Sequence, residues 1–208
     1  MELKKLEVTA FADLLASDAP APGGGSTAAL EGALGAALTA MVCGLTVGKA
    51  KYAASQELAA SVREKCAALQ VRFLDVMDRD TEAFNAVAAA FALPKGTEEE
   101  KAARSKAIQA ALRGCIDTPM EMMELAAETL ELTESLLGRF NDSAASDLGV
   151  AALSLRSAIQ GAWLNVRINI SSIKDQDLAE RSRARGEALL AKALPAADRI
   201  YAAVLDMM

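Results

Sequence analysis

Residues 19–38 have the sequence "APAPGGGSTAALEGALGAAL", in which two prolines and three consecutive glycines come directly before a run of small residues. Glycine takes backbone angles closed to other residues and lets a ligand or another backbone come close. The hydroxyl of Ser26 can accept a hydrogen bond from the unpaired N–H groups of a helix that it opens. The stretch therefore predicts a tight loop before a helix over residues 26–47, with an N-terminus that suits negative charge.

The composition favours helix throughout the chain. Hydrophobic residues make up 52% of the sequence and aromatic residues only 4%, so alanine, leucine and methionine supply most of the apolar surface, and these residues favour helices. Apolar positions recur at helical spacing, without strand-like alternation. We therefore expect an all-α, bundle-like single domain over residues 1–208. About seven helices are predicted, over residues 8–17, 26–47, 52–92, 97–116, 119–139, 143–170 and 175–206.

Charge and residue usage exclude several classes of function. The net charge is −6, which argues against nonspecific binding of nucleic acid. The chain has no histidine, so a histidine-based catalytic triad is excluded and a transition-metal site is disfavoured; we predict no metal. The three cysteines, Cys43, Cys66 and Cys115, are odd in number and far apart. They are expected to be reduced, buried thiols of a cytoplasmic protein.

The most apolar segment raises the question of a membrane. Residues 32–48 carry no charge, but the run is short for a membrane span and rich in glycine, alanine and threonine. We interpret it as a helix buried in a soluble core. Residues 1–15 lack an apolar signal-peptide core. We therefore expect no association with a membrane.

One predicted helix face is apolar except for a single carboxylate, Asp80. An unpaired carboxylate in an apolar stripe is costly, so it is either paired or functional. Burial would raise its pKa toward the range useful for proton transfer. The alternative is a buried ion pair that fixes helix packing, and the pattern alone leaves both open. The face consists of Val62, Cys66, Leu69, Phe73, Met77, Asp80, Phe84, Val87 and Phe91.

A second face is made of small residues with polar residues at its ends. Asp147 stands at one end, and Asn165 and Asn169 at the other. Small side chains let another backbone or a flat ligand come close, and the polar groups could orient a substrate. The alternative is close packing of helices. The intervening positions are Ala151, Ser154, Ala158 and Gly161.

Other features carry weaker signals. The glycine-rich loop is neither a P-loop nor a dinucleotide-binding fingerprint, because it lacks the GxxxxGK[ST] pattern and no strand precedes it. Lys174 and three arginines form a basic cluster, interpreted as a solvated helix face or as a site for an anionic substrate tail. The arginines are Arg181, Arg183 and Arg185.

Three segments together resemble one enzyme family. They are "PAPGGGSTAALEGALGAALTAMV" at 20–42, "DRDTEAFNAVAAAFALPKGTEEEK" at 78–101 and "SDLGVAALSLRSAIQGAWLNVRIN" at 146–169. In this order they resemble the cyclodeaminase domain of formimidoyltransferase-cyclodeaminase and the stand-alone methenyltetrahydrofolate cyclohydrolases. The resemblance spans about residues 8–180. Because one domain accounts for the whole chain, any formimidoyltransferase step is expected from a separate protein.

The resemblance implies an all-α homodimer or higher oligomer that holds a reduced folate between helices, without a metal or redox cofactor. It places the catalytic group at Asp80, in a "DxDxxAF"-like segment. Asp147 is expected to orient the substrate or stabilise its cationic centre. The remaining residues implied in substrate binding are Gly23, Gly24, Gly25, Ser26, Phe84, Lys95, Asn165 and, less securely, Asn169.

Two reactions fit this family, and cyclodeamination is our first expectation. In it, N10 of 5-formimidoyltetrahydrofolate attacks the formimidoyl carbon and ammonia leaves, giving the 5,10-methenyl form. In the alternative, cyclohydrolysis, water opens 5,10-methenyltetrahydrofolate to 10-formyltetrahydrofolate. A further alternative from another class is a non-catalytic helical interaction protein, in which Asp80 would be paired with Lys or Arg.

Overall fold

The computed structural model describes residues 2–208, and this part of the chain is all-α. Its six α-helices are α1 (Val8–Leu15), α2 (Gly24–Thr46), α3 (Gln56–Phe91), α4 (Glu98–Ser135), α5 (Ala145–Ile170) and α6 (Gln176–Leu205). Three short 3₁₀ segments accompany them: η1 (Leu3–Lys5), η2 (Ala50–Ser55) and η3 (Asp142–Ala144). The predicted all-α single domain is confirmed.

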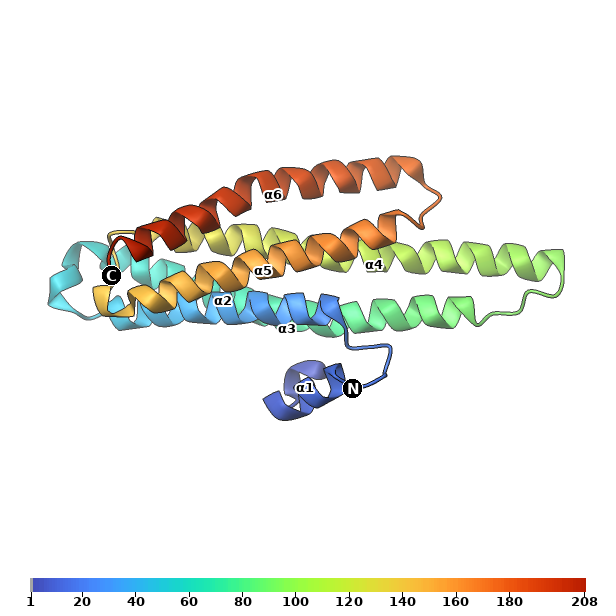
Figure 1. Ribbon diagram of the computed structural model, residues 1–208, viewed down its shortest axis with the longest axis horizontal. Helices are drawn as coiled ribbons and strands as arrows, with labels where there is room; N and C mark the ends of the chain where they lie inside the picture. The colour runs from blue at the N-terminus through green and yellow to red at the C-terminus, as the bar shows by residue number, and fades with distance from the viewer. Residues whose placement is uncertain (1) are drawn as a thin grey trace.

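Helices α2 to α5 form an up-and-down four-helix bundle. α2 packs between α3 and α5, α4 packs against the same two helices from the other side, and α6 covers α4 and α5. α1 lies outside this bundle, and η1 packs on α3. Figure 1 shows that α2 begins part-way along the bundle, whereas α3 and α4 continue past its first residue. The first turn of α2 therefore lies against the side of α3.

Glycines let α2 pack closely between its neighbours. A Cβ on Gly32 would lie 2.6 Å from Cδ1 of Phe73 in α3, and one on Gly35 would lie 2.6 Å from Cγ of Leu155 in α5. By length and composition α2 is apolar enough to cross a membrane. Its contacts with α3 and α5 account for part of that composition, because half of this apolar window is buried inside the molecule.

The structure corrects the predicted break between helices at residues 116–119. Pro119 lies inside α4, which runs without interruption from Glu98 to Ser135. Proline has no N–H, so the carbonyl of Cys115 loses its helical donor. Nδ2 of Asn169 in α5 donates to that carbonyl at 2.9 Å. A side chain from the neighbouring helix thus replaces the missing bond, and residues 2–208 form six α-helices where about seven were expected.

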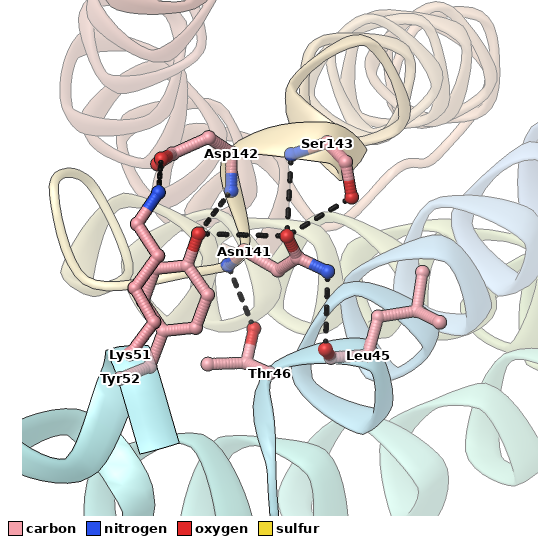
Figure 2. A network of polar contacts seen from close by, with 7 residues as sticks. All are labelled: Leu45, Thr46, Lys51, Tyr52, Asn141, Asp142 and Ser143. Carbon is pink, nitrogen blue, oxygen red and sulfur yellow. Dashed lines mark hydrogen bonds and ion pairs between the residues drawn. The ribbon is translucent and has the colours of Figure 1, made fainter. Parts of the chain in front are cut away.

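A polar network closes the end of the bundle where α2 ends (Figure 2). Asn141 lies at its centre. Its backbone N–H donates to Oγ1 of Thr46 at 2.9 Å, and its Nδ2 donates to the carbonyl of Leu45 at 3.1 Å. Its Oδ1 accepts from the hydroxyl of Ser143 at 2.9 Å and from the Ser143 N–H at 3.3 Å. Both ends of the Asn141 amide are therefore satisfied.

The same network ties η2 to η3. The Asp142 N–H donates to the hydroxyl of Tyr52 at 3.1 Å, and Nζ of Lys51 pairs with Oδ2 of Asp142 at 2.6 Å. Figure 2 shows Lys51 and Tyr52 of η2 reaching Asp142 of η3. These hydrogen bonds and this ion pair stabilise the end of the bundle, and each polar group at the centre of the network has a partner.

Candidate active site

A cavity of about 220 Å³ lies where the N-terminus of α2 meets the side of α3. Asp80, Thr81 and Phe84 line it from α3. The rest of its wall comes from the loop before α2, the first turn of α2, and one residue of α5. The lining residues are Pro20, Ala21, Gly23, Gly24, Gly25, Ser26, Asp80, Thr81, Phe84 and Asn165.

Asp80 is a largely buried carboxyl group without a cationic partner. Burial raises its pKa above the usual value of 3.8, and hydrogen bonds from the hydroxyls of Thr118 and Ser26 lower that pKa in part. Oγ1 of Thr118 lies 3.3 Å from Oδ1 of Asp80, and it shares its single proton with the carbonyl of Gly114 at 3.0 Å. No Lys or Arg within residues 2–208 forms an ion pair with Asp80. The hypothesis of a buried ion pair is therefore wrong.

Gly25 is the glycine that Asp80 requires. A Cβ at position 25 would lie 2.8 Å from Cγ of Asp80 and would overlap the carboxyl oxygens. A Cβ on Gly24 would make only an ordinary contact, at 3.8 Å from Nδ2 of Asn165, and one on Gly23 would meet nothing within 4 Å. None of the three has a positive φ. The glycine is needed for close approach rather than for an unusual backbone angle.

Ser26 does not cap α2, contrary to our expectation. The helix begins at Gly24 with Gly23 as its N-cap, and no side chain caps it. Ser26 is buried in the first turn, where its hydroxyl and that of Thr81 share a hydrogen bond at 3.2 Å. Within residues 2–208, no acceptor pairs with the N–H groups of Gly24, Gly25 or Ser26. The cavity therefore lies beside three available donors at a helix N-terminus.

Phe84 and Asn165 border the cavity from opposite helices. Phe84 stands one turn after Asp80 on α3, and 41% of its surface is exposed. Nδ2 of Asn165 donates to the carbonyl of Gly161 at 2.9 Å, which fixes the side chain against α5. An apolar ring and an oriented amide thus flank the carboxyl group.

Three predicted site residues lie outside this cavity. Asp147 is near the start of α5, 18 positions before Asn165, which corresponds to about 27 Å along the helix. Asn169 donates both amide hydrogens to backbone carbonyls, those of Cys115 and Asn165. Lys95, in the loop after α3, lines a separate cavity. The remaining seven predicted residues are brought together.

Sequence reasoning missed Thr118, Thr81 and two residues of the loop before the glycines, Pro20 and Ala21. Thr118 reaches Asp80 from α4, 38 residues along the chain. Helical spacing relates residues of one helix only, so no pattern in the sequence identifies this contact. Thr81 follows Asp80 directly and could have been found from that adjacency.

The family is decided by comparison with known proteins. The sequence model described as Formiminotransferase-cyclodeaminase matches residues 7–188. The chain belongs to this family.

Relatives cover both activities named in the family. The methenyltetrahydrofolate cyclohydrolase of Methylorubrum extorquens is 42% identical over 197 residues, which are 95% of each chain. The formimidoyltransferase-cyclodeaminase of Rattus norvegicus is 34% identical over 88% of this chain, but that match spans only 34% of the rat protein. The crystal structure of a formiminotetrahydrofolate cyclodeaminase from Thermotoga maritima has a TM-score of 0.89 and 26% identity, over 99% of both chains. The expected family and an enzymatic role are thereby confirmed.

Burial keeps the cysteine thiols of this family member in their neutral form. The three cysteines are free and buried, as predicted. Burial raises the pKa of Cys115, which lies near Asp80, to about 11, so it stays a thiol at neutral pH. Within residues 2–208, no cluster of three or more Cys, Asp or Glu side chains is arranged to hold a metal ion.

Proposed function

We propose that the protein is a methenyltetrahydrofolate cyclohydrolase, which adds water to 5,10-methenyltetrahydrofolate and gives 10-formyltetrahydrofolate. The observation that carries the proposal is the largely buried carboxyl of Asp80, which has no cationic partner within residues 2–208 and lies in a cavity beside free helix N–H groups. The sequence favoured cyclodeamination. The end-to-end 42% identity with a methenyltetrahydrofolate cyclohydrolase favours hydrolysis instead.

In the proposed mechanism, Asp80 is first a base and then an acid. Water attacks the methenyl carbon, and the Asp80 carboxylate takes a proton from it. This gives a tetrahedral carbon bonded to N5, N10 and a hydroxyl group. The protonated Asp80 returns its proton to N5 as the carbon–N5 bond breaks, and the hydroxyl proton goes to solvent as the formyl C=O forms. Proton transfer of this kind is typically worth about 10²–10⁴ in rate.

The raised pKa of Asp80 suits both halves of this cycle. A carboxyl group at its ordinary pKa is a weak base and is rarely protonated near neutral pH, so it is poor at returning a proton. Burial moves the Asp80 pKa upward, closer to the working pH, where acceptance and return of a proton are better balanced. The free N–H groups of Gly24, Gly25 and Ser26 would bind an acceptor oxygen of the substrate, and Asn165 would bind its ring edge.

Cyclodeamination is the second candidate, favoured by the match to the Thermotoga maritima structure over 99% of both chains. In that reaction Asp80 would take a proton from N10 as N10 attacks the formimidoyl carbon of 5-formimidoyltetrahydrofolate. It would return a proton to the departing nitrogen, which leaves as ammonia. The cavity offers the same carboxyl group for both reactions.

We also propose a homodimer in the cytoplasm. Free, buried thiols accord with a reducing compartment. Exposed apolar side chains line the outer faces of α2 and α5, which suits a second copy. An antiparallel two-fold pairing there would place the start of one α5 against the end of the other and so bring Asp147 toward the partner's cavity. Light scattering tests it. The exposed residues include Leu34, Met41, Leu45, Val150, Leu153 and Leu164.

The deciding experiment offers the purified protein each folate separately and follows methenyl absorbance and ammonia. Enzyme-dependent loss of 5,10-methenyltetrahydrofolate, with no ammonia from the formimidoyl substrate, supports the cyclohydrolase. A rise in methenyl absorbance with stoichiometric ammonia from 5-formimidoyltetrahydrofolate would replace it with the cyclodeaminase. Turnover of neither substrate would reject both proposals.

A further inference from the structure

Thr118 contacts the Asp80 carboxyl group from behind the cavity. It lies on α4 and is buried, with 7% of its surface exposed. Its Oγ1 lies 3.3 Å from Oδ1 of Asp80, but Thr118 is not one of the residues that line the cavity. A substrate in the cavity would therefore contact the carboxyl group and not the threonine, so Thr118 can act only through Asp80.

The two carboxyl oxygens of Asp80 have different surroundings. Oδ1 is the oxygen within hydrogen-bond distance of Thr118. Oδ2 is the oxygen nearer to a Cβ placed on Gly25, so it lies toward the first turn of α2, which forms part of the cavity wall. The oxygen that Thr118 does not hold is thus the one directed toward the N-terminus of α2.

Close packing of α4 brings Thr118 within reach of Asp80. A Cβ on Gly114 would lie 3.5 Å from the Cβ of Ala83 in α3, which is ordinary van der Waals contact. On the next residue of α4, the Cys115 carbonyl accepts from Nδ2 of Asn169 at 2.9 Å. This turn of α4 is therefore held against both α3 and α5, and the position of Thr118 is fixed with it.

The Thr118 hydroxyl has one proton and two acceptors. The carbonyl of Gly114 lies 3.0 Å from its Oγ1, and Oδ1 of Asp80 lies 3.3 Å away. In an α-helix this carbonyl also accepts from the backbone N–H four positions later, so it keeps a donor when the hydroxyl turns away. An ionised carboxylate is the stronger acceptor, because charge-assisted hydrogen bonds are roughly twice as strong as neutral ones. The hydroxyl proton can therefore follow the charge on Asp80.

Thr129, on the same helix, lacks this second acceptor. It is completely buried, and its hydroxyl donates to the Leu125 carbonyl at 2.7 Å, its one side-chain hydrogen bond to a carbonyl or carboxylate among residues 2–208. Both threonines thus bond back to the preceding turn of α4, but only Thr118 also reaches a carboxyl group. The difference makes Thr129 a matched control for Thr118.

We propose that Thr118 is a positioning residue, whose hydroxyl holds Oδ1 of Asp80 so that Oδ2 faces the reacting atoms. The inference rests on the proposed function, in which Asp80 takes and then returns a proton. The hydroxyl donates to Oδ1 while Asp80 is ionised and turns to the Gly114 carbonyl once Asp80 is protonated. Thr118 thereby stabilises the carboxylate form and limits how far burial raises the pKa of Asp80.

The other groups that face Asp80 stay uncharged while it titrates. Cys115 of α4 is the titratable one, and burial raises its pKa to about 11. Ser26 of α2 and Asn165 of α5 are neutral, as are the α3 side chains that line the cavity beside Asp80. A change in the Asp80 pKa on removal of the Thr118 hydroxyl can therefore be attributed to that hydroxyl.

The test is the pH profile of kcat/KM, measured with whichever of the two folates the protein turns over. Its acid limb reports the ionisation of the base in the free enzyme. Thr118→Val should shift that limb upward by about one pH unit, so that kcat/KM on the limb falls about tenfold. KM should be unchanged, because Thr118 does not line the cavity. Thr118→Ser keeps the hydroxyl and should retain the parent profile, as should Thr129→Val.

An unshifted acid limb in Thr118→Val, including a uniform loss of activity at every pH, would overturn the proposal. An equal shift in Thr129→Val would do the same. The NMR signal of the Asp80 carboxyl carbon, identified by its loss in Asp80→Asn, reports the pKa without substrate and so separates this inference from the proposed function. A higher Asp80 pKa in Thr118→Val than in the parent supports the role of Thr118 even if neither folate is turned over, and an equal pKa rejects it.

Discussion

The two ends of α2 handle buried polar groups in opposite ways. At its C-terminus, the amide of Asn141 finds partners for both its oxygen and its nitrogen (Figure 2). At its N-terminus, the largely buried carboxyl of Asp80 has only hydroxyl partners among residues 2–208, and three helix N–H groups find no acceptor there. A satisfied network stabilises a fold, whereas an under-compensated carboxyl costs stability and stays available for chemistry. The contrast distinguishes the end of α2 that stabilises the fold from the end where we propose that catalysis takes place.

The largest expected effect is on turnover by the Asp80→Asn variant. It should lose about 10²–10⁴ in kcat because asparagine cannot carry the proton, while the melting temperature should not fall. Steady-state kinetics and thermal melting measure the two. Asp142→Asn is the control, because Asp142 is an exposed carboxylate at the other end of α2. A fully active Asp80→Asn protein would refute the assignment.

The second-largest effect on kcat is expected for the Gly25→Ala variant. Its Cβ would displace the Asp80 carboxyl, and a shift of about 1 Å at a reacting group can cost about 10²-fold in rate. Gly23→Ala is the matched control, because that position is open and its φ of −139° suits alanine. Measuring kcat for both variants tests the close approach. Equal activity would show that the carboxyl moves aside without consequence.

At the C-terminal end of α2, the Asn141→Ala substitution should lower stability and leave catalysis unchanged. The substitution leaves the Leu45 carbonyl and the Ser143 hydroxyl without their partners, which should cost about 1–3 kcal/mol in free energy of unfolding. Urea denaturation measures the loss, and kcat should stay within twofold, roughly. A large fall in kcat with unchanged stability would contradict the division between the two ends.

The smallest expected effect is a pH dependence of stability. Because the folded-state pKa of Asp80 lies above 3.8, the folded protein binds more protons than the unfolded chain between the two pKa values. The contribution of Asp80 to the free energy of unfolding therefore falls as pH rises through that window. Asp80→Asn removes this fall, so its stability relative to the parent should increase as pH rises from about 4 through the folded-state pKa of Asp80. A constant difference in urea denaturation would show that the Asp80 pKa is not raised.

The fold and the centre of the candidate site were largely predictable from sequence, because both depend on spacing within single helices. Asp80 stood out as the one carboxylate in an apolar stripe, and the glycines marked a close approach. Contacts between different helices could not be predicted from the sequence. Thr118 reaches Asp80 from α4, and Asn169 substitutes for the donor that Pro119 lacks. The second of these also explains why a proline that predicted a helix end lies inside α4.

The bond between Asn169 and the Cys115 carbonyl makes substitutions at positions 119 and 169 depend on each other. Were Pro119 replaced by a residue with an N–H, the helix would satisfy Cys115 itself, and this bond of Asn169 would become redundant. Were Asn169 lost while Pro119 stayed, a buried carbonyl would have no donor. The order in which the two positions change therefore matters. The pair can be replaced without leaving a buried carbonyl unpaired only if Pro119 is substituted before Asn169.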